Sequence, residues 1–147
     1  MTTESFKLHG ALTAHLVKPD GTVQTVQKNN MIVNVGFDFI ANAIGAASGR
    51  PGAMNTIAVG TGTTAVAATH SQLVTQLAYK AATYKHTSNT KVFTFTTTFN
   101  PGEATGAITE AGVFNGNKGI MLDRVVFSVI NKGAQDTLTM TFTFTMA

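Results

Sequence analysis

The stretch that decides the fold is TLTMTFTFTM, residues Thr137–Met146. Threonine occupies every second position, and the positions between are apolar: Leu138, Met140, Phe142, Phe144 and Met146. Successive side chains of a β-strand point to opposite faces of the sheet, so this alternation predicts a strand with one apolar and one hydroxyl face. The polar face offers no acid or base, and no nucleophile other than threonine.

The same alternation recurs near the start of the sequence, at Phe6 to Val17. One face of this strand carries the apolar set Phe6, Leu8, Leu12, Ala14 and Leu16, and the other carries Lys7, His9, Thr13 and His15. Pro19-Asp20-Gly21 then predicts a turn, because proline presets one corner and glycine accepts a positive φ at the next. With a partner strand at 22–27, residues 6–27 are predicted to form a hairpin.

Further strands are expected at 56–60, in the second half of 73–86, at 91–99, and on both sides of the Asn/Gly turn 116–119. Residues 31–47 break the pattern, since their apolar positions recur at helical spacing: Val35, Phe39, Ile40, Ala43 and Ile44. A helix at about 35–47 is predicted, with Asn34 as N-cap and Gly45 or Gly49 at its end. The whole sequence, 1–147, is predicted to be a single all-β domain, an antiparallel, jelly-roll-like β-sandwich of about seven to eight strands with one short helix.

The composition favours a protein that docks on a neighbour. Apolar residues make up 44% of the 147 residues and charged residues only 12%, about half the usual charged share. Threonine, asparagine, glutamine and glycine take the place of surface charge. An oligomer or a large assembly is therefore expected.

Several classes of protein are disfavoured. The net charge is +3, but the basic residues are scattered rather than clustered as in a nucleic-acid binder. There is no cysteine, which excludes disulfides and thiol chemistry. The first ten residues do not resemble a secretory signal, and no apolar run is long enough to span a bilayer, so we expect no membrane contact.

No motif predicts catalysis, a cofactor or a metal. Gly60 to Thr64 (GTGTT) lacks both the ending of a phosphate-binding loop and the third glycine of a dinucleotide fingerprint, which favours a tight turn after a strand. His9 and His15 are too far apart along one strand to share a metal, and His70 and His86 are expected to face solvent. Only Glu110 and Asp123 would face each other, across the 116–119 hairpin. A glycosidase pair is conceivable there, but a salt bridge or solvated pair is favoured.

Three stretches carry a resemblance: IAVGTGTT (57–64), GAITEAGVFN (106–115) and MLDRVVFSVINKGAQDTLTMTFTFT (121–145). They resemble, in this order, a family of small virion structural proteins of tailed bacteriophages. The polar hairpin near the start and the segment 29–36 ahead of the helix fit as well. The resemblance implies a structural role, in the head as a decoration (cement) protein or in the tail as a fibre protein.

A head location is favoured because the sequence is compact, without coiled coil or fibrous repeats. The expected partners are the major capsid protein lattice and further copies of the chain, as a dimer or trimer. The expected location is the capsid surface of the virion, after synthesis in the host cytoplasm. The alternative is a tail fibre or baseplate-associated adhesin for a host receptor, which exposed aromatic residues such as Tyr79 and Tyr84 would favour.

Overall fold

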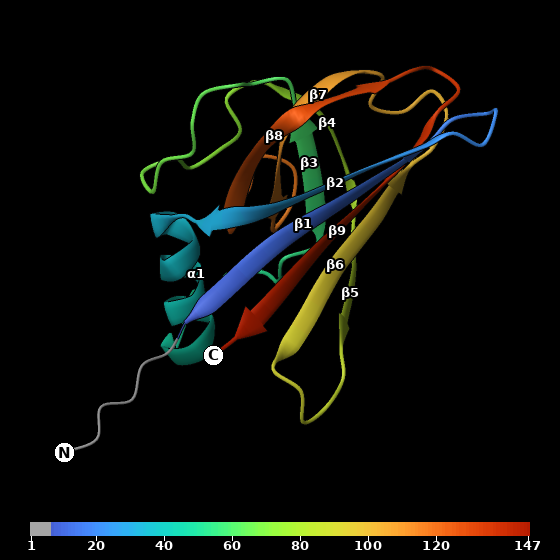
Figure 1. Cartoon of the computed structure of the whole chain (residues 1–147). Helices are drawn as coiled ribbons and strands as arrows, with labels where there is room; N and C mark the ends of the chain where they lie inside the picture. The colour runs from blue at the N-terminus through green and yellow to red at the C-terminus, as the bar shows by residue number, and fades with distance from the viewer. Residues whose placement is uncertain (1–6) are drawn as a thin grey trace.

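The computed structural model describes residues 7–147 and contains, in that range, nine strands and one helix (Figure 1). The elements are, in order, β1 (Leu8–Val17), β2 (Val23–Ile32), α1 (Asn34–Gly45), β3 (Thr56–Gly60), β4 (Gln76–Ala81), β5 (Thr83–His86), β6 (Val92–Phe99), β7 (Gly106–Phe114), β8 (Asp123–Lys132) and β9 (Thr137–Met146).

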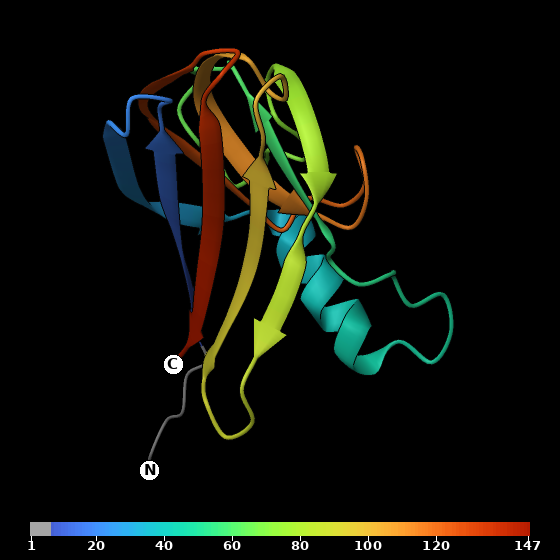
Figure 2. The same ribbon diagram turned by 90° about the vertical axis from the view of Figure 1, so that its right-hand side faces the viewer.

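The strands form one antiparallel sheet in the order β4-β3-β7-β8-β2-β1-β9-β6-β5. The two outermost strands, β4 and β5, are consecutive in the chain and separated only by Ala82, so the sheet coils into a nearly closed barrel (Figure 2). Side chains of β4 and β6 complete the closure: Thr97 Oγ1 donates to the Ala81 carbonyl (2.8 Å), and Lys80 Nζ donates to the Thr98 carbonyl (2.8 Å).

The all-β prediction with one helix is confirmed, but the predicted jelly-roll sandwich of seven to eight strands is not the observed arrangement. Nine strands share a single sheet. Alternation predicts which side chains of a strand face inward. It does not distinguish a sandwich of two facing sheets from one coiled sheet, because both bury the same face of each strand. The hairpin around 116–119 and the strand in the second half of 73–86 are present as predicted.

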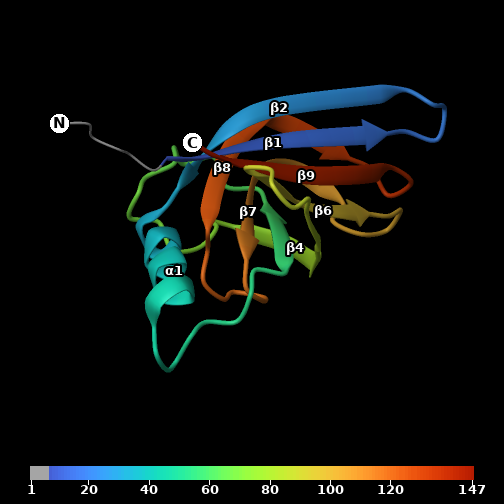
Figure 3. The same ribbon diagram turned by 90° about the horizontal axis from the view of Figure 1, so that it is seen from below.

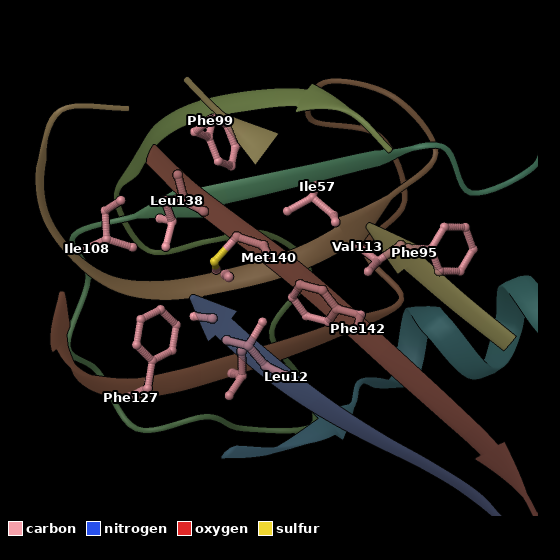
Figure 4. Close-up of a cluster of buried hydrophobic side chains, with 14 of the residues drawn as sticks. Leu12, Ile57, Phe95, Phe99, Ile108, Val113, Phe127, Leu138, Met140 and Phe142 are labelled. Atoms are coloured by element: carbon pink, nitrogen blue, oxygen red, sulfur yellow. The ribbon is translucent and has the colours of Figure 1, made fainter. Parts of the chain in front are cut away.

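The barrel interior is filled from β9, which lies between β1 and β6 (Figure 4). Its inward residues Leu138, Met140, Phe142 and Phe144 are fully buried, as are Leu12, Ala14 and Leu16 of β1. Both alternating patterns are thus confirmed, except that Leu8 and Met146 are only half-buried. Phe6 lies outside the described residues. Each large apolar side chain contributes about 1.5–3 kcal/mol on burial.

Helix α1 lies against one end of the barrel (Figure 3) and differs from the prediction at two points. Asn34 is the first helical residue rather than the cap, and Val33 occupies the N-cap position without a side-chain bond. Ile44 is not directed inward but is 81% exposed. The helix makes its closest approach through Gly36, where an added Cβ would overlap the Leu122 carbonyl. It ends at Gly45, one of the two glycines predicted to end it.

Candidate functional site

A buried polar centre lies where residues 57–64, 106–115 and 121–145 meet. The carboxylate of Glu110, in β7, is fully buried. It accepts hydrogen bonds from the backbone N–H groups of Gly62 (2.7 Å), Val74 (2.8 Å) and Thr75 (2.8 Å), and from Nε of Arg124 (3.0 Å). Burial alone would raise the pKa of Glu110, but these donors together hold it below the ordinary value. The carboxylate is ionised and saturated, which suits it to hold a loop rather than to exchange protons.

Arg124, in β8, extends this centre into the loop between β3 and β4. Its guanidinium is fully buried and donates through Nη1 to the Thr64 carbonyl (2.9 Å) and to His70 Nδ1 (3.3 Å). The same His70 nitrogen accepts from the Ala67 N–H at 3.2 Å. Two donors on Nδ1 place the ring proton on Nε2. His70, which sequence reasoning expected to face solvent, thus belongs to this network.

The glycines of the GTGTT motif pack against the carboxylate of Glu110. Gly60 and Gly62 pack so closely around the carboxylate and the Thr75 carbonyl that neither position has room for a Cβ. The motif follows strand β3 as irregular backbone rather than as the predicted tight turn, and it is wrapped around a buried anion. Sequence reasoning missed this role. The available signal was a glutamate inside the otherwise apolar strand AITEAGVF.

Asp123 occupies a second buried polar position and is not paired with Glu110. Its Oδ1 accepts from the Val113 N–H (3.0 Å), and its Oδ2 accepts from Asn30 Nδ2. Burial raises the pKa of Asp123 to about 7, against the opposing effect of these two hydrogen bonds. The structure therefore does not bring Glu110 and Asp123 together as a salt bridge, a solvated pair or a pair of catalytic carboxylates.

The remaining histidines carry local contacts only. His15 Nδ1 is 3.1 Å from Thr25 Oγ1, and His86 Nδ1 is 2.8 Å from the Val92 carbonyl. Within residues 7–147, no group of three or more His, Asp or Glu side chains is arranged to hold a metal ion.

The outer side of β1, β9 and β6 forms an uncharged surface, which we call the threonine face. Its hydroxyl residues are Thr13, Thr94, Thr96, Thr98, Thr139, Thr141 and Thr143, and the exposed His15 lies beside them, opposite Thr139 in the register. The strand register aligns Thr13 with Thr141 and Thr141 with Thr96, and Thr98 and Thr139 are 3.0 Å apart at their hydroxyls. These three adjacent strands contain no Asp, Glu, Lys or Arg.

An apolar pocket of about 430 Å³ opens between α1, the following loop and the barrel. Phe39 and Ile40 line it from the helix, and Tyr84 and Phe93 line it from β5 and β6. The Tyr84 ring is 55% exposed and lies with its centroid 6.2 Å from that of Phe93. The only charged residue in the lining is Arg50, whose guanidinium donates to the Ala43 carbonyl. The pocket suits an apolar or aromatic group.

Comparison with known proteins gives no assignment: no family model, no curated protein and no solved structure matches this chain. No helix of the described segment is both long and apolar enough to cross a membrane.

Proposed function

We propose that this chain is a structural protein of a tailed-bacteriophage virion, which decorates the outer capsid shell and stabilises the head by bridging capsid subunits. The resemblance of residues 57–64, 106–115 and 121–145 to virion structural proteins motivates the proposal. The observation that carries it is the threonine face, three adjacent strands without a single charged residue.

An uncharged hydroxyl face is suited to dock on another protein. Solvent-exposed sheet surfaces ordinarily carry charges that keep a chain soluble and separate. Removing a hydroxyl from water costs far less than removing a charge, and a neighbouring protein can supply the replacement hydrogen bond. The three strands of the face are paired with one another along their length, so the face is a continuous sheet surface.

Stabilisation of the head follows from mass action. A protein that binds only the mature shell stabilises it by about 2.7 kcal/mol per site when its free concentration is a hundredfold above Kd. Many copies on one shell add their contributions. No catalytic step is required.

The test compares phage particles with and without the protein. Depleted particles should assemble but release DNA at a lower temperature or after osmotic shock, and added protein should restore resistance. Gold-labelled antibodies should mark the head. Depleted particles with full heat resistance would contradict the proposal.

A second function is a tail-associated adhesin, favoured by the aromatic pocket around Tyr84. Aromatic rings at the mouth of an apolar pocket are suited to contact a receptor group. In that case depleted particles would keep their heat resistance and fail to adsorb to cells, and the label would mark the tail.

A further inference from the structure

Strand β2 is paired along only part of one edge. It follows β1 from Val23 to Asn30, but it meets β8 through two residue pairs alone, Met31 with Arg124 and Ile32 with Asp123. Toward the start of β2 no further residue pair joins it to β8, although β2 lies between β8 and β1 in the sheet order. In Figure 3 this part of β2 lies along one margin of the molecule. Nearly all its side chains from Val23 to Asn29 are exposed.

The strand register identifies which backbone N–H and C=O groups of β2 are not hydrogen-bonded to β1 or β8. The backbone N–H of Lys18 donates to the Thr22 carbonyl (2.9 Å), and in an antiparallel pair the hydrogen-bonded positions alternate. Even-numbered residues of β2 therefore bond to β1, and odd-numbered residues point away. The odd-numbered Met31 indeed pairs with β8. The remaining outward residues are Val23, Thr25, Gln27 and Asn29, whose backbone groups have no partner within residues 7–147. We call this row the free edge of β2.

Nothing in the strand protects the free edge. Exposed edges are normally blunted by proline, bulges or several charges. Residues 23–30 contain no proline, their pairing with β1 has no register shift, and Lys28 is their only charge. A row of unpaired N–H and C=O groups binds an extended strand, which identifies the partner chemistry.

We propose that the free edge pairs with the free edge of β2 in a second copy of this chain, antiparallel, about a twofold axis at Val26. Val23 then lies opposite Asn29 of the second copy, and Thr25 opposite Gln27. Four hydrogen-bonded pairs with two bonds each give about eight backbone hydrogen bonds, and every outward group of the free edge is used.

Charge and sheet continuity favour a second copy as the occupant. In this register Lys28 lies opposite Gln24, so the only charge meets no like charge. The pairing also joins the two sheets, which places the threonine faces of both copies on one continuous sheet. The inference deepens the proposed function by naming the self-contact, and it rests on that function only for the expectation of self-association.

Opposite charges at position 24 give a test specific to this register. Gln24 and Lys28 form a non-hydrogen-bonded pair across the axis, where side chains are closest. Within one copy they lie about 13 Å apart, at 3.3 Å per residue. Gln24→Glu should therefore tighten the dimer and Gln24→Lys should weaken it. With two symmetric contacts, their Kd values should differ by about 3- to 30-fold.

Sedimentation equilibrium of the full chain over a concentration series measures these values, at low and high salt, where the difference should shrink. Gln72→Glu and Gln72→Lys make the same change in net charge at an exposed position away from β2, and their Kd values should agree. Equal Kd values for the two Gln24 variants, or a strict monomer for the natural chain, would overturn the inference.

Hydrogen exchange provides an independent readout in the natural chain. Amides of Val23, Thr25, Gln27 and Asn29 should exchange fast in dilute samples and slowly in concentrated ones, whereas Gln24, Val26 and Lys28 should be protected in both. A dimer with fast-exchanging outward amides overturns the inference, as does protection that appears only on phage particles.

Two results separate this inference from the proposed function. A monomer that still binds capsids would overturn the β2 pairing alone. A β2-paired dimer without capsid binding would support the pairing and contradict the decoration function.

Discussion

Glu110 is the residue on which the loop between β3 and β4 depends, since it binds three backbone amides of that loop and the buried Arg124. Glu110→Gln removes the negative charge and turns an amide group toward backbone donors. A buried cation left without its partner costs about 3–5 kcal/mol. We expect the free energy of unfolding, measured with urea, to fall by about that amount.

The matched control is Glu103→Gln. Glu103 pairs with Lys80 at 2.9 Å, but both side chains are substantially exposed, and such pairs contribute little. Its urea midpoint should stay close to that of the natural chain. Equal losses for the two variants would show that the Glu110 network does not support the loop.

Stability should respond to pH with opposite signs at Asp123 and Glu110. The folded state raises the pKa of Asp123 from 3.8 to about 7, so between these values the native chain keeps a proton that the unfolded chain has lost. Stability from this group therefore falls as pH rises from about 4 to 7. Glu110 has its pKa lowered from 4.5, and its contribution is lost as pH falls below that value through the folded pKa.

The variant that isolates the first effect is Asp123→Asn. It should abolish the decline between pH 4 and 7 and leave the acid-side loss in place, as measured by urea unfolding at a series of pH values. Asp20→Asn, in the exposed turn, should keep the decline. If Asp123→Asn leaves the slope unchanged, the carboxyl is ionised in the folded protein across this range.

Sequence patterns predicted which side of the sheet a side chain faces, but they did not predict the hydrogen-bond partners of the buried polar side chains. The alternation in Thr137–Met146 placed Phe142 and Phe144 in the core, because facing depends on local geometry alone. The partners of Glu110 are backbone amides of a loop without periodic pattern, so no spacing rule indicates them.

At the scale of one strand, the inward side chains of β9 contribute to stability and its outward side chains form the surface. Phe142 and Phe144 are fully buried, and Phe→Ala in a core costs about 3–5 kcal/mol. Thr141 and Thr143 point outward, and β-propensity spans only about 1 kcal/mol in total. Thermal melts should show a large loss of Tm for Phe142→Ala or Phe144→Ala and a small one for Thr141→Ala or Thr143→Ala. Similar losses would mean that both faces of β9 are buried.

Helix α1 shows where element prediction reached its limit. Apolar spacing of 3.6 predicted the helix at about 35–47 with Gly45 or Gly49 at its end, and the observed helix ends at the first of these glycines. The spacing includes Ile44 among the apolar positions, but Ile44 is exposed. The helix covers only one end of the barrel, and its last turn extends past the surface that it packs on. Which part of an amphipathic helix is covered depends on neighbours from other parts of the chain.

For the whole molecule, the number of sheets was the property that the sequence left open. The strands β1, β9 and β6 were all predicted by alternation, yet their order in the sheet joins segments from both ends of the chain. The barrel closes at Ala82, which lies between β4 and β5. Strand β4 pairs with β3 on one side of this residue, and β5 pairs with β6 on the other. No local pattern at this residue distinguishes a bend within a barrel from a connection between two sheets.

The docking proposal concerns the whole molecule and leads to a prediction about Thr141, which the register places between Thr13 and Thr96 near the middle of the threonine face. Thr141→Lys would add a charge to a surface that has none, and an unpaired charge costs several kcal/mol when it is buried in a contact. Binding to depleted phage particles, measured by co-sedimentation, should weaken by at least about tenfold, while Tm changes little. Thr87→Lys makes the same substitution at an exposed turn position away from the face, and it should bind normally. If Thr141→Lys binds like the natural chain while Ile44→Lys on the exposed end of α1 does not, the particle contacts the helix and its pocket instead.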